Sequence, residues 1–84
     1  MTIQCTEALQ RAVLDDIRGV LGHVPMSFDC VTLSPADEGS CRGVVGCSEA
    51  GGHRWDLQLL VSLDGEEVVW ELESEPGSHR FRWR

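Results

Sequence analysis

The stretch RWDLQLLVSLDGEEVVWEL, residues 54–72, contains the signals for a pair of antiparallel strands, from which the rest of the sheet is predicted. Apolar and polar side chains alternate along its first half, which predicts a strand with one buried face. The Asp64-Gly65 dipeptide that follows is typical of a two-residue hairpin turn, so we expect paired strands at about 53–63 and 66–74. Pairing outward from this turn sets apolar residues opposite one another on the inner face: Val61–Val68, Leu59–Trp70 and Leu57–Leu72.

A second turn, at Pro76-Gly77, predicts that the chain folds back once more as a strand at about 79–84. The same register then puts apolar pairs on the inner side and opposite charges on the outer side, and the agreement of the two faces favours it. The expected pairs are Leu72–Phe81 and Trp70–Trp83 inside, and Glu73–Arg80 and Glu71–Arg82 outside.

On the N-terminal side, an apolar stripe recurs every four residues, at Cys5, Leu9, Val13 and Ile17. This spacing predicts a helix over about 6–21 whose stripe packs on the inner face of the sheet. Thr6 or Thr2 is suited to cap its N-terminus.

Two further strands, at about 26–33 and 41–49, complete the expected sheet. A tight turn at Gly51-Gly52 sets Glu49 opposite Arg54 and Val44 opposite Leu59, and it places Gly46 against Leu57. The prediction is a single α+β domain over residues 1–84, with one N-terminal helix packed on a four- to five-stranded antiparallel meander.

Composition and charge narrow the function. Seven arginines, no lysine and 14 acidic residues give a net charge of -7 over 84 residues, which argues against direct binding to nucleic acid. No apolar run has the length of a membrane span, and the N-terminus shows no signal-peptide pattern, so we expect a cytoplasmic protein of a bacterial cell. The absence of lysine, asparagine and tyrosine is typical of a GC-rich genome, which favours a bacterium or one of its phages.

The four cysteines are expected to be free thiols in a reducing compartment. In the predicted register Cys41 and Cys47 lie far apart on the outer face, so we expect neither a disulfide nor a metal ion between them, and no cofactor. The chain carries no Gly-x-Ser-x-Gly, phosphate-loop or His-Glu-x-x-His motif. Acidic Asp56 beside Cys47 disfavours a reactive thiolate, and Asp15-Asp16 is expected to be solvated surface. We therefore predict that the protein is not an enzyme.

The outer face of the predicted sheet carries a small apolar patch, Leu60 opposite Val69 with Val45 adjoining, among carboxylates that include Asp56 opposite Glu73. Such a patch is typical of a protein-binding surface, and the same residues also suit an ordinary solvated face. The candidate partner-binding residues are Asp56, Leu60, Glu67, Val69, Glu71 and Glu73, with Asp37 and Glu38 in a loop as secondary candidates.

Carboxylates select a basic partner, and many basic surfaces in a bacterial cell belong to proteins that bind nucleic acid. By analogy of size, charge and origin with anti-CRISPR proteins, we expect an inhibitor, encoded by a phage or mobile element, that blocks a basic nucleic-acid-binding protein or complex. The alternatives are an immunity protein or antitoxin that neutralises a basic toxin, a small thiol- or metal-binding protein, and a structural homodimer. We expect a monomer or weak homodimer that binds neither nucleic acid nor a membrane.

Overall fold

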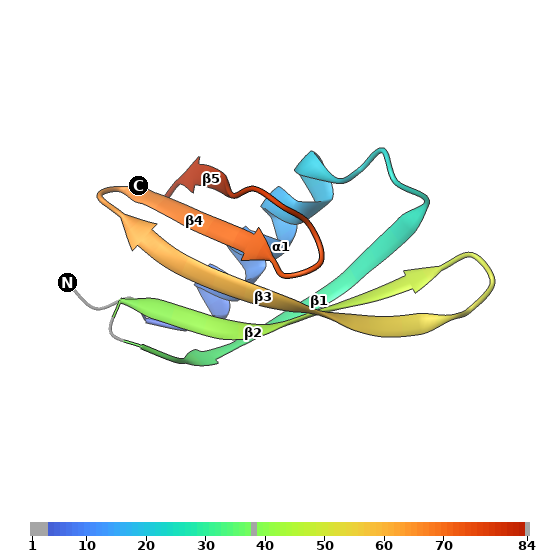
Figure 1. Cartoon of the computed structure of the whole chain (residues 1–84), viewed down its shortest axis with the longest axis horizontal. Helices are drawn as coiled ribbons and strands as arrows, with labels where there is room; N and C mark the ends of the chain where they lie inside the picture. Colours follow the sequence, from blue (N-terminus) through green and yellow to red (C-terminus); the bar gives the residue numbers. More distant parts are fainter. Residues whose placement is uncertain (1–3, 38, 84) are drawn as a thin grey trace.

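One helix and a five-stranded antiparallel sheet make up the computed structural model, which describes residues 4–37 and 39–83. The strands lie in the sheet in the order in which they occur along the chain, so the sheet is a meander (Figure 1). This confirms the predicted α+β class. The elements are α1 (Glu7–Val20), β1 (Met26–Pro35), β2 (Ser40–Glu49), β3 (Arg54–Asp64), β4 (Glu67–Leu72) and β5 (His79–Arg82).

Helix α1 begins after Thr6, whose hydroxyl oxygen accepts a hydrogen bond from the backbone N–H of Leu9 at 3.1 Å. Its buried side chains, Leu9, Val13 and Ile17, are the predicted stripe. Two polar side chains of the helix also bond to the backbone of edge strand β1. The Gln10 Oε1 atom accepts from the N–H of Leu33 at 2.8 Å, and Arg18 Nε donates to the carbonyl oxygen of Phe28 at 2.9 Å. These bonds satisfy backbone groups that an edge strand otherwise leaves free for another chain.

Trp70 on β4 is the largest fully buried side chain. Its ring stacks on that of His79 with 4.5 Å between centroids, and its Nε1–H donates to Asp16 Oδ2 at 2.7 Å. Asp16 is half-buried. The expectation that Asp15-Asp16 is only solvated surface is therefore wrong for Asp16, which connects the helix to the sheet.

The β3–β4 hairpin has the predicted faces but a register shifted by two residues. Asp64 pairs with Glu67, so the turn residues are Gly65 and Glu66. Gly65 has a φ of 64°, which the first central position of a type II′ turn requires. Because side chains alternate with a period of two, this shift keeps each one on its expected face. The inner pairs are Leu59–Leu72, Val61–Trp70 and Leu63–Val68, which correct the predicted ones.

The β4–β5 register is shifted by four residues from the predicted one. Val68 pairs with Phe81 and Trp70 pairs with His79, because the connection after β4 runs from residue 73 to 78 and is longer than a tight turn. The expected pairs Leu72–Phe81, Trp70–Trp83, Glu73–Arg80 and Glu71–Arg82 are therefore wrong.

The β2–β3 register is shifted by one residue, which exchanges the faces of β2. Ser48 pairs with Arg54 and Gly43 with Leu59, so the predicted pairs Glu49–Arg54, Val44–Leu59 and Gly46–Leu57 are wrong. The loop has three residues, 50–52, ending in Gly52 with a φ of 84°, because the N–H of Glu49 bonds to the carbonyl oxygen of His53 at 3.1 Å. The residues thereby moved from the expected outer face into the core are Cys41, Val45 and Cys47.

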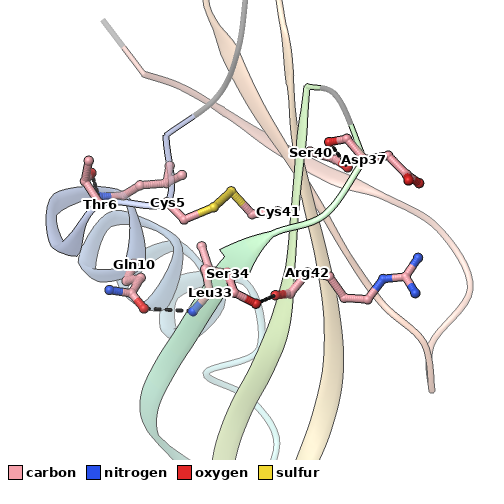
Figure 2. Close-up of a disulfide and its surroundings, with 10 residues drawn as sticks. Cys5, Thr6, Gln10, Leu33, Ser34, Asp37, Ser40, Cys41 and Arg42 are labelled. Carbon is pink, nitrogen blue, oxygen red and sulfur yellow. Dashed lines mark hydrogen bonds between the residues drawn. A yellow bond between two sulfur atoms is a disulfide. The ribbon is translucent and has the colours of Figure 1, made fainter.

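A disulfide joins Cys5, just ahead of α1, to Cys41 on β2 (Figure 2). The two Cα atoms are 6.2 Å apart across a sequence separation of 36. The expectation of four free thiols is therefore wrong for this pair. Helix packing brings Cys5 over the inner face, and the register shift turns Cys41 toward it. Cys30 and Cys47 are free, the first exposed and the second buried.

The sheet is not equally wide along its length (Figure 1). At one end, which we call the closed end, all five strands lie side by side. One row of paired residues there runs through Pro35, Cys41, Val61, Trp70 and His79. At the other end β4 stops at Leu72, opposite Leu59, and only β1, β2 and β3 continue. We call this continuation, residues 26–31, 45–49 and 54–57, the arm.

Candidate partner-binding surface

Six of the predicted residues lie on the outer face of the sheet, opposite to the face that packs on the helix: five on β3 and β4, and Glu73 directly after β4. They alternate with the buried residues Leu59, Val61, Val68, Trp70 and Leu72. Four of the six are exposed, and Glu67 and Val69 are half-buried. The six are Asp56, Leu60, Glu67, Val69, Glu71 and Glu73.

The two predicted loop residues are not part of this group. Asp37 lies in the connection between β1 and β2 (Figure 2), where its carbonyl oxygen accepts hydrogen bonds from the backbone N–H of Ser40 at 3.0 Å and from its hydroxyl at 3.2 Å. This exposed residue therefore shapes a turn. Glu38 lies outside the described residues.

Neighbours within the outer face differ from the predicted ones because of the register shifts. Leu60 lies opposite Glu71, and Val69 lies opposite Ser62. The N–H of Glu73 bonds to the carbonyl oxygen of Gln58 at 3.0 Å, which continues the Leu59–Leu72 register, so the predicted Asp56–Glu73 pair is wrong. Val45 is buried on the inner face and does not adjoin Leu60. The predicted apolar patch is thus reduced to Leu60, whose 37% exposure is high for a large apolar side chain.

Charges on the outer face divide into two groups. Arg80 Nη1 lies 3.2 Å from Asp64 Oδ2 and 3.3 Å from Glu67 Oε1, and Arg82 Nη2 lies 3.1 Å from Glu66 Oε2. These pairs occupy the β4–β5 end. In the part of the chain that the structure describes, no ion pair includes Asp56, Glu71 or Glu73. These three carboxylates lie on the side of the face toward the arm.

A depression of about 290 Å³ lies within this acidic half. Leu60 and Gln58 contribute to it from β3, Glu71 and Glu73 from the end of β4, and Arg42 from β2. Figure 2 shows the Arg42 side chain directed away from α1, whereas that of the neighbouring Cys41 is directed toward it. The predicted register misses Arg42, because it places this residue on the inner face. The cost of burying an arginine is the signal that favours the opposite face.

A second depression, of about 180 Å³, lies on the inner face where the arm leaves the core. Its lining is mostly apolar, with Ser74 and Glu75 as the two polar residues. The sequence patterns give no indication of it, because its apolar lining residues are expected to pack in the core. The lining residues are Leu21, Val24, Met26, Phe28, Trp55, Leu57, Leu72, Ser74 and Glu75.

The free thiol of Cys47 is poorly suited to nucleophilic chemistry. Burial raises its pKa, and the carboxylates of Asp29 and Asp56 and the thiol of Cys30 raise the pKa further. The thiolate is therefore disfavoured. The described residues contain no group of three or more His, Cys, Asp or Glu side chains that is arranged to hold a metal ion, and none of their helices is long and apolar enough to cross a membrane.

Comparisons with known proteins identify no relative of this chain. The chain matches no protein-family model, and no curated protein and no solved structure is significantly similar to it.

Proposed function

We propose that this protein is a non-enzymatic inhibitor that binds a basic protein through the outer face of its sheet. The observation that carries the proposal is the group Asp56, Glu71 and Glu73, three carboxylates without an ion-pair partner among the described residues. Glu71 and Glu73 line the depression beside the exposed side chain of Leu60, and Asp56 lies further along the same face of β3. Unpaired like charges on one face disfavour folding, and a cationic partner relieves that repulsion.

Electrostatics supports a partner of opposite charge. A net charge of -7 on 84 residues accelerates association with a basic surface, in a manner that salt weakens. Leu60, opposite Glu71, adds an apolar contact beside the charged residues, as in the core of a protein interface. Proteins that bind nucleic acid present such basic surfaces, and carboxylates are suited to the positions where they bind phosphates. The target class we propose is therefore a basic nucleic-acid-binding protein or complex of a bacterial cell, as for anti-CRISPR proteins.

A second target class uses the same surface. A basic toxin presents the same chemistry, and the protein would then be an immunity protein or antitoxin. The two classes differ in what the captured protein does: the first loses nucleic-acid binding when the inhibitor is present, and the second loses toxicity.

The proposed site of action is the bacterial cytoplasm, and the Cys5–Cys41 disulfide has to persist there. Disulfides are rare in that reducing compartment, but Cys41 has no exposed surface, which slows attack by a reductant. Trapping the thiols by alkylation in intact cells, followed by mass spectrometry, measures whether the pair is oxidised there.

Capture of the partner from a host lysate tests the proposal. The baits are the wild-type chain, the double variant Glu71→Arg/Glu73→Arg, and Glu71→Arg with Asp15→Arg as a control of the same net charge. Asp15 is exposed on α1, so this control moves one of the two reversals off the sheet. We expect the double variant to lose about tenfold or more in affinity for the captured basic protein at low salt.

The control and the salt dependence decide the result. The control variant is expected to retain more of the affinity than the double variant, and higher salt is expected to weaken binding of the wild type. If a basic partner binds the wild type and the double variant equally at low salt, the outer face is not the binding surface.

A further inference from the structure

Strand β3 has a free edge in the arm. Its residues from Leu59 onward pair with β4, and its residues from Arg54 to Ser62 pair with β2. From Arg54 to Leu57, no described strand lies on the side where β4 would continue. Figure 1 shows β3 extending past the end of β4, while the chain after β4 turns back toward β5.

Hydrogen bonds at both ends of this segment show which backbone groups face the free side. The carbonyl oxygen of His53 accepts from Glu49 of β2 at 3.1 Å, whereas that of Gln58 accepts from Glu73, which follows β4, at 3.0 Å. In an antiparallel sheet the N–H and C=O of one residue point to the same side, and the side alternates along the strand. The N–H and C=O groups of Arg54 and Asp56 therefore point away from β2, to the free edge.

The two faces beside this edge have opposite chemistry. On the inner side lies the apolar depression of about 180 Å³ that includes Trp55, Leu57 and Leu72. On the outer side lie Arg54, which pairs with Asp29 at 3.7 Å, and the carboxylates of Asp56 and Glu73, for which the described residues provide no ion-pair partner. An added strand presents alternate side chains to the two faces, so it meets apolar groups with one set and carboxylates with the other.

We propose that the partner binds by strand addition: an extended segment with alternating basic and apolar side chains pairs with β3 at Arg54–Leu57. This inference rests on the proposed function and specifies how the partner engages the acidic half of the face. Main-chain hydrogen bonds to Asp56 contribute affinity, and the alternation contributes specificity.

The protein contains an example of this pattern in its own β5. That strand pairs with β4, placing Arg80 and Arg82 on the outer face against carboxylates and Phe81 opposite Val68 on the inner face. The arm offers the same arrangement one strand earlier, with the basic strand absent. A partner segment of the type Arg-apolar-Arg thus has the complementary charge and spacing.

The experiment uses the full chain and a short synthetic peptide in which arginine and valine alternate. Binding is measured by calorimetry, and exchange of the Asp56 amide hydrogen is followed by NMR. We expect the peptide to bind and to slow that exchange. A second peptide of the same sequence, with N-methyl groups on the backbone nitrogens that would pair, is expected to bind about tenfold more weakly, because it cannot form the ladder.

The variant Asp56→Pro removes the N–H at the free edge without removing a hydrogen bond to β2. We expect it to weaken peptide binding by about tenfold. Asp56→Asn is the matched control, because it also removes the charge but keeps the N–H, and it is expected to bind more tightly than Asp56→Pro.

The outcomes separate this inference from the proposed function. Equal binding of the two peptides by the wild type overturns strand addition, whether or not Asp56→Pro folds. Absence of peptide binding also overturns it, as does self-association that Asp56→Pro abolishes, because a second copy is then the occupant. In each case the capture experiment with Glu71→Arg/Glu73→Arg decides the proposed function independently.

Discussion

The closed end and the arm are two parts of one sheet with different contents. The closed end has the full width of the sheet, the Cys5–Cys41 disulfide, and buried Trp70 bonded to the helix. The arm lacks β4 and β5, and its tryptophan, Trp55, is only half-buried beside an open depression. Arginines pair with Asp64, Glu66 and Glu67 near β5 and with Asp29 in the arm, whereas no ion pair among the described residues includes Asp56, Glu71 or Glu73. The residues that stabilise the fold are thus separated from those available for binding, so each set can be changed by itself.

The largest difference in stability between the closed end and the arm is expected when the tryptophan of each is replaced. Trp70→Ala removes a fully buried ring and leaves Asp16 without its donor, so we expect a loss of about 3–5 kcal/mol in the free energy of unfolding. Trp55→Ala removes a half-buried ring from the arm and is expected to cost about 1 kcal/mol. Urea denaturation followed by circular dichroism measures both.

A loss for Trp55→Ala as large as that for Trp70→Ala would show that the arm is part of the cooperative core. Because a domain of this size has little stability to lose, Trp70→Ala is also expected to be largely unfolded in buffer.

The disulfide is expected to have the second largest effect. Its loop closes a separation of 36 residues, and the loss of conformational entropy that it imposes on the unfolded chain corresponds to about 3–4 kcal/mol. Cys5→Ser is therefore expected to lower the free energy of unfolding by about that amount and to make it insensitive to dithiothreitol. Cys30→Ser, at an exposed free thiol, is the control and should change it by less than about 0.5 kcal/mol. Wild-type stability that is equal with and without dithiothreitol would contradict the prediction.

How well the sequence predicts each strand depends on whether the register shift is an even or an odd number of residues. The helix and the inner faces of β3 and β4 are predictable because their apolar spacing is regular, and a shift of two or four residues leaves each face unchanged. On β2, Gly43 and Gly46 carry no side chain that distinguishes the faces. At Gly43 an added Cβ would overlap the carbonyl oxygen of Thr32, so a glycine is required by the close approach of β1. A three-residue loop then moved the register by one, and every side chain of β2 changed face.

The disulfide and the arm were not predictable for a related reason. Cys5 and Cys41 meet only when the helix lies over the correct face of β2, and no local pattern encodes that contact. The arm results from the unequal lengths of β3 and β4, since β4 ends at Leu72 whereas β3 begins at Arg54. The predicted strands at 53–63 and 66–74 have nearly equal lengths, which leaves no free edge. Of the site, the acidic outer residues were predicted, and the cost of burying an arginine could have placed Arg42 beside them, whereas neither depression was predictable.

The two free thiols of the arm, Cys30 and Cys47, are expected to differ in reactivity, and Cys47 is expected to have a smaller effect on stability than the disulfide. Cys30 is exposed and Cys47 is buried, so we expect an alkylating reagent to modify Cys30 first and Cys47 only on unfolding. Burial, together with Asp29, Asp56 and Cys30, raises the pKa of Cys47 above 9.0. As pH rises through 9, the unfolded thiol therefore loses its proton before the folded one, and stability decreases.

Urea denaturation at pH 8, 9 and 10 measures this decrease, and Cys47→Ala provides the control because it removes the titrating group. The pH dependence above about 9 is expected to be smaller in Cys47→Ala than in the wild type. The same pH dependence in both proteins would show that Cys47 does not contribute to it, and rapid alkylation of Cys47 in the folded protein would show that the inner face of the arm is open.

The smallest effects on stability are expected from the outer-face charges. Loss of a paired charge should lower the free energy of unfolding, and loss of an unpaired one should leave it unchanged or raise it. Arg80→Ala removes the cation paired with Asp64 and Glu67 and is expected to lower the free energy of unfolding by less than about 1 kcal/mol, since these groups are half-exposed. Glu71→Gln removes one of the unpaired carboxylates and is expected to leave stability unchanged or to raise it by a few tenths of a kcal/mol. Added salt should reduce both differences, because it screens attraction and repulsion alike. If Glu71→Gln destabilises the protein as much as Arg80→Ala does, then Glu71 contributes to the fold, and the carboxylates toward the arm are not held free for a partner.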